Sequence, residues 1–196
     1  MSREGRSVKL APITPGMVGF LYDLATDDEI GWRWRYAGVI PRRDTFEQFL
    51  WNGVLSQFVV VERATEGAIG SVIAYNADLN NGFAYVAAGM SRGAIDSGIG
   101  VEAVDLFIAH LFACYRLRKL YFEVPEYNLS QFSSAIGWLF RNEGVQADHT
   151  FYNGRFWDRY ILALYRGDYE KVGTNVKVLG RRRRPVVRDV NEHPVS

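Results

Sequence analysis

Three glycines, Gly93, Gly98 and Gly100, lie just before a segment whose apolar residues recur at helical spacing. Glycine tolerates unusual backbone dihedral angles and permits close approach, so such a loop can direct several backbone N–H groups toward one anion. The helix that follows would add its own unpaired N–H groups and the positive end of its dipole. A phosphate is therefore the expected ligand, although the same turn could serve only to connect a strand to a core helix.

The segment behind this loop is predicted to be a long amphipathic helix. Its apolar residues recur three and four positions apart, the spacing of one buried helix face: Val104, Phe107, Ile108, Leu111 and Tyr115. The stretch from Met90 to Tyr115 thus passes from a strand end through the loop into a helix. We expect the rest of the chain to be arranged around it.

The remaining chain is predicted to contain both strands and helices. Strands are expected, from β-branched content and bounding turns, over residues 7–14, 57–63, 68–75, 83–90, 119–124 and 156–165. Residues 147–151 are expected to pair with the last of these across a turn at 151–155. Helices are expected over residues 15–27, with Thr14 as the cap, over 44–54 and over 129–140.

The turn and connection signals predict how these strands pair. Asn80-Asn81-Gly82 is a hairpin signal, so the three strands before the long helix are expected to be antiparallel. A strand–helix–strand connection favours parallel pairing, which we expect between residues 83–90 and 119–124.

Composition sets limits on the class of protein. The chain has 196 residues and a formal net charge of +1, so one domain is expected, without a global field that favours nucleic acid or anionic lipid. Its single cysteine, Cys114, excludes an intramolecular disulfide and fits a reducing cytosol. No apolar run is long enough for a signal peptide or a transmembrane segment, so a cytoplasmic protein is expected.

The chain changes character after residue 170. Residues 1–170 are predicted to form the domain, and residues 171–196 a basic, disordered C-terminal tail. The run from Arg181 to Arg184 could touch RNA or an acidic surface, or it could be a solvated terminal segment. No nucleic-acid recognition motif accompanies it.

The order of elements and three sequence matches resemble the GNAT family of acyl-CoA N-acyltransferases, in particular its RimJ/RimL-like branch. Ile99 to Ala103 resemble the family's G-[ILM]-G-x-E-A run, and residues 151–169 resemble the branch's closing hairpin. Asn128, Phe140 and Glu143 keep the family's N…GF…EG spacing. The resemblance implies an α/β (α+β) fold with a mixed, mostly antiparallel central sheet and helices on both faces.

The resemblance also implies acetyl-CoA as cosubstrate, with its pyrophosphate on the loop backbone and its pantetheine arm beside the fourth strand. No metal is expected. The residues implied in cofactor binding are Gly89, Met90, Ser91, Ile95, Asp96, Ser97, Gly98, Ile99, Gly100, Val101 and Asn128. Ile95 stands where the family has a basic residue and Asp96 where glycine is usual, with Arg92 as the nearest replacement cation.

Acetyl transfer to an amine needs a base for the ammonium, donors for the oxyanion and a proton for the leaving thiolate. Glu123, five residues before Asn128, occupies the position of a catalytic glutamate in related enzymes, although it could also be a solvent-facing strand residue. Glu126 is a weaker candidate for the same role. Those enzymes often place a tyrosine seven residues after the asparagine, where this chain has Ala135. That leaves Ser133, Ser134, Tyr127 or a water as the general acid.

The acceptor site of this fold would lie between the early helices and the last hairpin. The aromatic and basic residues there could form a pocket and hold an acidic group, or they could be core aromatics with exposed arginines: Trp32, Arg33, Trp34, Arg35, Tyr36, Arg42 and Arg43.

The function expected from the resemblance is N-acetyltransfer from acetyl-CoA to a primary amine, either a protein N-terminus or a small molecule. Two alternatives are a non-catalytic CoA-binding scaffold of the same fold and an RNA- or ribosome-associated protein that uses the basic tail. The resemblance allows a homodimer, whereas membrane and nucleic-acid partners are not expected.

Overall fold

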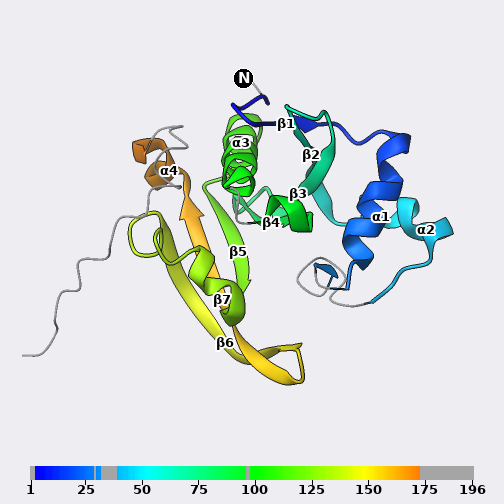
Figure 1. Ribbon diagram of the computed structural model, residues 1–196. Helices are drawn as coiled ribbons and strands as arrows, with labels where there is room; N and C mark the ends of the chain where they lie inside the picture. Colours follow the sequence, from blue (N-terminus) through cyan, green and yellow to red (C-terminus); the bar gives the residue numbers. More distant parts are fainter. Residues whose placement is uncertain (1–2, 29, 32–38, 96–97, 173–196) are drawn as a thin grey trace, which may run out of the picture.

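A mixed seven-stranded sheet forms the centre of the computed structural model, which describes residues 3–28, 30–31, 39–95 and 98–172 (Figure 1). The strands are β1 (Val8–Ala11), β2 (Val54–Glu62), β3 (Ala68–Asp78), β4 (Phe83–Met90), β5 (Lys119–Pro125), β6 (Phe140–Tyr152) and β7 (Arg155–Tyr165). They lie in the order β1-β2-β3-β4-β5-β7-β6. Every neighbouring pair is antiparallel except β4 and β5, which are parallel. The expected fold class and the parallel pair are thus confirmed.

Helices cover both faces of this sheet. The α-helices are α1 (Val18–Thr26), α2 (Arg43–Phe49), α3 (Ile99–Cys114) and α4 (Arg166–Val172). The 3₁₀ turns are η1 (Pro15–Met17), η3 (Arg92–Ala94) and η4 (Glu126–Gln131). Figure 1 shows α3 on one side of β2 and β3 and the pair α1–α2 on the other.

The two faces carry two separate hydrophobic cores because successive strand residues point to opposite sides. In β2, Val60 packs with Phe107 of α3 in the larger core, whereas Val59 packs with Leu21 of α1 and Phe46 of α2 in the smaller one. All five of these side chains are buried. The cores therefore fix which strand positions face α3 and which face α1 and α2.

The parallel strands β4 and β5 separate after a short paired region. They pair only from Phe83 with Lys119 to Tyr85 with Tyr121. Beyond that point β4 stays paired with β3 as far as Met90, and β5 stays paired with β7 as far as Pro125. The sheet is thus divided into two halves whose facing strand ends do not bond to each other.

The predicted helix over residues 129–140 is wrong. A short 3₁₀ turn, η4, ends at Gln131, and Phe140 already begins β6 opposite Leu164 of β7. The apolar residues that suggested a helix instead form a compact cluster, in which the rings of Phe132 and Phe140 both pack against Phe122. Tertiary packing of aromatic rings has overridden the helical spacing.

Three smaller differences concern element ends. The second predicted helix ends at Phe49 rather than Val54, because Gly53 has a φ of 66° and Val54 opens β2. Thr14 occupies the N-cap position of η1, but its side chain makes no capping hydrogen bond. The penultimate strand begins at Phe140 rather than at residue 147. Of the predicted tail over residues 171–196, the first two residues end α4 and the rest lies outside the described residues, so the domain boundary stays a prediction.

Candidate functional site

The start of α3 lies beside the end of β4. The N–H of Ser91, just after β4, donates to the carbonyl of Ile69 at 2.8 Å, which holds the strand end against β3. A Cβ atom on Gly100 would lie 3.3 Å from Cγ of Met90, so the first turn of α3 packs directly on the strand end. Gly89 is buried in the same region.

Gly98 is the N-cap of α3 and has the left-handed φ of 77°. A Cβ at this position would meet nothing within 4 Å, so the space over the loop is open. The N–H groups of Ile99, Gly100 and Val101 belong to the first helical turn, where no intrahelical acceptor is available. Backbone donors and open space are what an anion at a helix N-terminus needs. Asp96 and Ser97 lie outside the described residues.

Arg92, the basic side chain of the described loop, bonds to a carboxylate outside the loop. Ile95, which stands where the resembled family has a basic residue, is 39% exposed. Arg92, the predicted replacement, instead donates to both carboxylate oxygens of Asp27 at the end of α1, from Nε at 3.3 Å and from Nη2 at 3.2 Å. The loop is thereby connected to α1, and anion binding would depend mainly on the backbone.

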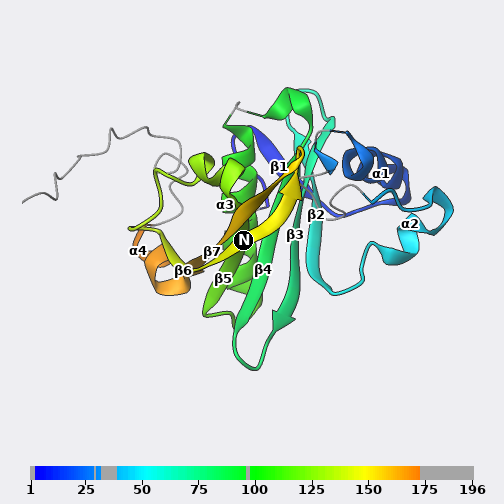
Figure 2. The same cartoon turned by 90° about the horizontal axis from the view of Figure 1, so that it is seen from below.

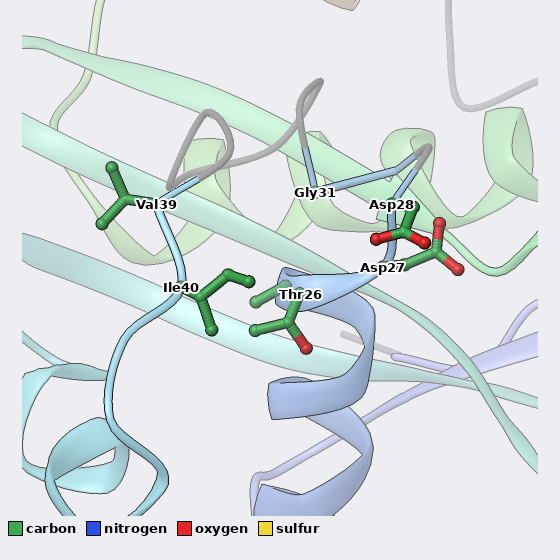
Figure 3. A pocket seen from close by; sticks show the side chains of 7 residues that line it. Thr26, Asp27, Asp28, Gly31, Val39 and Ile40 are labelled. Carbon is green, nitrogen blue, oxygen red and sulfur yellow. The ribbon is translucent and has the colours of Figure 1, made fainter.

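A small hollow lies at this end of α1 (Figure 3). It is lined by Ala25, Thr26, Asp27, Asp28, Gly31, Val39 and Ile40. The residues predicted for the acceptor site, Trp32, Arg33, Trp34, Arg35 and Tyr36, lie in the adjoining segment, outside the described residues. Of the two further arginines, Arg42 pairs with Asp44 at 2.6 Å and Arg43 lies over the ring of Tyr22.

Glu123 projects from β5 on the sheet face opposite α3, because its neighbours Phe122 and Val124 pack in the α3 core. Its carboxylate accepts a hydrogen bond from the hydroxyl of Tyr75 at 3.1 Å and pairs with Nη1 of Arg159 at 3.3 Å. The Glu123 side chain is 25% exposed and that of Arg159 24%. The Glu123 carboxylate is therefore largely shielded from solvent. It lies two residues beyond the last pairing of β5 with β4.

A row of tyrosine rings lies on the same face of the sheet. The centroids of Tyr75 and Tyr85 are 5.8 Å apart, and the rings of Tyr85 and Tyr121 are stacked at 5.2 Å. Burial and the neighbouring Glu123 carboxylate raise the pKa of Tyr75 above its ordinary value, so its hydroxyl stays protonated and serves as a donor. The tyrosine rings and Glu123 thus lie on one face of the sheet, next to the point where β4 and β5 separate.

Sequence reasoning missed Tyr75, Tyr85 and Arg159. The alternation within each strand could have placed each of them on one face, but the registers between β3, β4, β5 and β7 could not be read from local sequence. Arg159 and Glu123 are 36 positions apart in the chain, and their contact depends on the register that pairs Pro125 with Arg159.

The other predicted site residues lie in and after η4. The Ser133 hydroxyl is exposed and donates to the carbonyl of Ser130 at 2.8 Å. Ser134 is also exposed, and its carbonyl accepts a hydrogen bond from the Trp138 indole at 2.7 Å. Asn128 lies half-buried in η4. Neither of these serine interactions brings a hydroxyl to Glu123.

Comparisons with known proteins identify the fold. No family model matches the chain. A curated relative, the uncharacterized N-acetyltransferase p20 of Bacillus licheniformis, is 25% identical over 118 residues, which span 60% of this chain and 66% of that relative. The spermidine N-acetyltransferase of Vibrio cholerae, solved in complex with CoA and spermine, matches 84% of this chain and 98% of its own, with 20% identity and a TM-score of 0.72.

A probable acetyltransferase of the GNAT family from Chromobacterium violaceum matches 86% of this chain and 88% of its own, with 20% identity and a TM-score of 0.66. The chain has the GNAT fold. Within the described part of this GNAT fold, no helix is long and apolar enough to cross a membrane. The same described residues contain no cluster of three or more histidine, cysteine or acidic side chains that could hold a metal ion.

Proposed function

We propose that the protein is a cytoplasmic, acetyl-CoA-dependent N-acetyltransferase of the RimJ/RimL-like branch, which moves an acetyl group to a primary amine. The observation that carries the proposal is the separation of β4 and β5 beside the open N-terminus of α3, with Glu123 close to the point of separation. The curated N-acetyltransferase relative and the solved acetyltransferases of the same fold support it.

The proposed donor site uses mostly backbone groups. The N–H groups of residues 98–101 would hold the pyrophosphate, since Gly98 leaves the necessary space open. The end of β4, residues 88–91, presents an edge that β5 does not pair, and an extended pantetheine arm would lie along it as an added strand does. Asn128, in η4 just after β5, would hydrogen-bond the pantetheine or pyrophosphate region.

The proposed chemistry assigns the base to Glu123. The amine nitrogen forms a bond to the thioester carbon, the carbon–sulfur bond breaks, and the sulfur leaves as a thiolate. Of the two protons that the ammonium loses, one goes through Glu123 to solvent and the other neutralises the thiolate. A backbone N–H near Gly89 or Met90 would stabilise the oxyanion. Ser133, Ser134, Tyr127 and water stay candidates for the general acid.

A non-catalytic CoA-binding protein is the second candidate. Two observations favour it: Arg92 is held by Asp27, and a buried alanine, Ala135, stands where related enzymes place a tyrosine. Such a protein would bind acetyl-CoA and transfer nothing to any amine. The tail that an RNA-associated protein would use lies outside the described residues.

Calorimetric titration with acetyl-CoA, followed by an acetylation assay on a panel of amines, tests the proposal. One saturable site with a dissociation constant on the order of micromolar is expected. Glu123→Gln is expected to leave that constant within about threefold and to lower acetyl transfer by about 100-fold or more, since it removes the base. Glu126→Gln changes the weaker candidate base, an exposed acid three residues away, and should transfer at the wild-type rate.

Absence of acetyl-CoA binding would contradict the proposed function. Binding without transfer to any amine would favour the non-catalytic protein. Equal rates for the two glutamine variants would remove Glu123 from the role of base and leave the donor site in place.

A further inference from the structure

We infer that the Glu123–Arg159 ion pair recognises a zwitterionic acceptor, with the acceptor's ammonium on Glu123 and its carboxylate on Arg159. The acceptor class is then a free amino acid, in which the two charged groups are only two bonds apart. This inference rests on the proposed N-acetyltransferase function and specifies the substrate of that same site.

Each partner of the pair is fixed by a strand outside the β5–β7 ladder. On one side, the hydroxyl of Tyr75 in β3 donates to Oε2 of Glu123 at 3.1 Å. On the other, Nε of Arg159 donates to Oε1 of Gln146 in β6 at 2.9 Å. Both charged groups are therefore held in position before any ligand arrives, which lowers the entropic cost of binding.

The pair still has hydrogen-bonding capacity for a ligand. A guanidinium carries five N–H donors, and the contacts of Arg159 with Gln146 and Glu123 use Nε and Nη1. Nη2 has no acceptor among the described residues, so it can donate to a ligand carboxylate with the geometry that arginine favours. The Glu123 oxygens can likewise accept from an ammonium while keeping the Tyr75 bond.

Charge discriminates between acceptor classes at such a site. A polyamine would place a cation near Glu123 but would bring further positive charge toward Arg159. An anion that carries no amine would be repelled by the Glu123 carboxylate. An amino acid matches both charges in order, and because the two side chains are about three-quarters buried, mismatched charges are screened less than at an open surface.

The location suits the reaction as well as the recognition. Glu123 lies two residues beyond the last pairing of β5 with β4, and Arg159 lies opposite Pro125, at the end of the β5–β7 ladder. An ammonium on Glu123 would thus stand next to the gap proposed for the thioester. The carboxylate on Arg159 would orient it, so Arg159 is a specificity-determining residue.

Matched acceptors test the inference on the 196-residue protein saturated with acetyl-CoA. The twenty amino acids, their C-terminal amides and spermidine are assayed for acetylation, so that each acid is compared with an isostere that lacks only the carboxylate charge. At least one acid is expected to exceed its amide in kcat/KM by about tenfold or more. Arg159→Gln is expected to raise the KM of that acid by about 10- to 100-fold and to change the amide by less than about threefold.

Two further variants separate recognition from a structural role. Arg159→Lys keeps the positive charge but lacks the paired N–H donors of the guanidinium. It should recover part of the affinity for the amino acid that Arg159→Gln loses. Arg155→Gln, at an exposed arginine in the same strand that lies over the Trp157 ring, is the control and should leave the acid-to-amide ratio unchanged.

Several outcomes would overturn the inference while the proposed function stands: equal use of acids and amides, preference for spermidine, or transfer to other amines but to no amino acid. An equal loss for acid and amide in Arg159→Gln would show a structural ion pair only. If Arg159→Gln does not fold, the comparison of acids with amides on the wild-type protein still tests the inference. Absence of acetyl-CoA binding would overturn the proposed function itself.

Discussion

At the scale of single residues, Gly98 sets the geometry at the start of α3. Its φ of 77° lies in the left-handed region, which a residue with a Cβ enters at a cost of roughly 1 to 2 kcal/mol. A Cβ there would meet nothing within 4 Å, so a small side chain would be strained without being blocked. The cost of substitution is therefore conformational.

Gly98→Ala is expected to lower the free energy of unfolding by about 1 kcal/mol and to weaken acetyl-CoA binding by about fivefold, because the strained turn would misdirect the first N–H groups of α3. Urea unfolding and calorimetric titration measure the two effects. Gly93→Ala is the control, since a Cβ on Gly93 also meets open space and its φ is not left-handed. The same affinity for both variants would mean that the left-handed turn has no part in binding.

At the scale of elements, a half-buried ion pair joins β5 to β6 across β7. Nζ of Lys119 pairs with Glu143 at 2.7 Å, and the lysine side chain is only 8% exposed. The hydroxyls of Tyr121 and Tyr165 donate to the same carboxylate at 2.9 and 2.5 Å. Burial alone would raise the pKa of Glu143, but the hydrogen bonds from Lys119, Tyr165 and Tyr121 lower it to about 2.

This pair should make stability depend on pH under acidic conditions. A carboxylate whose pKa falls from 4.5 to about 2 on folding stabilises the folded state above pH 4.5, and that contribution is lost as the pH falls toward 2. Glu143→Gln is therefore expected to lower the free energy of unfolding by about 1 to 2 kcal/mol at pH 7, a value discounted for solvent screening, and by much less near pH 2.

Urea unfolding at several pH values measures this difference. Glu66→Gln is the matched control, because Glu66 also pairs with a lysine, Lys9, but its side chain is 65% exposed, and a loss below about 0.5 kcal/mol is expected. A constant difference between wild type and Glu143→Gln from pH 7 to pH 2 would contradict the assignment.

The elements also show where local sequence is sufficient to predict the secondary structure. The hairpin at Asn80-Asn81-Gly82, the strand from Phe83 to Met90 and the helix ending at Cys114 were predictable, because turn residues and periodicity specify them locally. The segment after β5 was not predictable, because Phe132 and Phe140 are fixed by the Phe122 ring, which local spacing does not encode.

The candidate site likewise contains residues that the sequence could predict and residues that it could not. Gly98 and Glu123 could be selected from sequence as site candidates, and both stay proposals. The partners of Glu123 could not, because Tyr75 and Arg159 reach it only through the registers of a sheet that joins distant segments.

At the scale of the whole molecule, α4 joins the end of the described chain to α3. The Arg166 guanidinium donates to the carbonyls of Phe112, Tyr115 and Leu117, at 2.6, 2.8 and 2.7 Å, so it satisfies groups at and just beyond the C-terminus of α3. The hydroxyl of Tyr169 donates to the Asp105 carboxylate at 2.9 Å inside the larger core. Residues of α4 thus hold the end of the described chain against α3.

Two truncations test this boundary. Removal of residues 173–196 is expected to change the free energy of unfolding by less than about 1 kcal/mol and to leave acetyl-CoA affinity unchanged, because every contact named above is kept. Removal of residues 166–196 is expected to cost about 3 kcal/mol or more, since it exposes the Tyr169 site and leaves the α3 carbonyls without their donor. Urea unfolding and calorimetry measure both chains.

Arg166→Gln separates the two contributions of α4. It removes the donors at the end of α3 but keeps Tyr169 in the core, so its loss should lie between those of the two truncations. If the shorter truncation alone abolished acetyl-CoA binding, the donor site would have to include residues beyond Val172, and the proposed domain boundary would be wrong. If both truncations were equally stable, α4 would be only an appended helix, and the sheet with α1, α2 and α3 would suffice for folding.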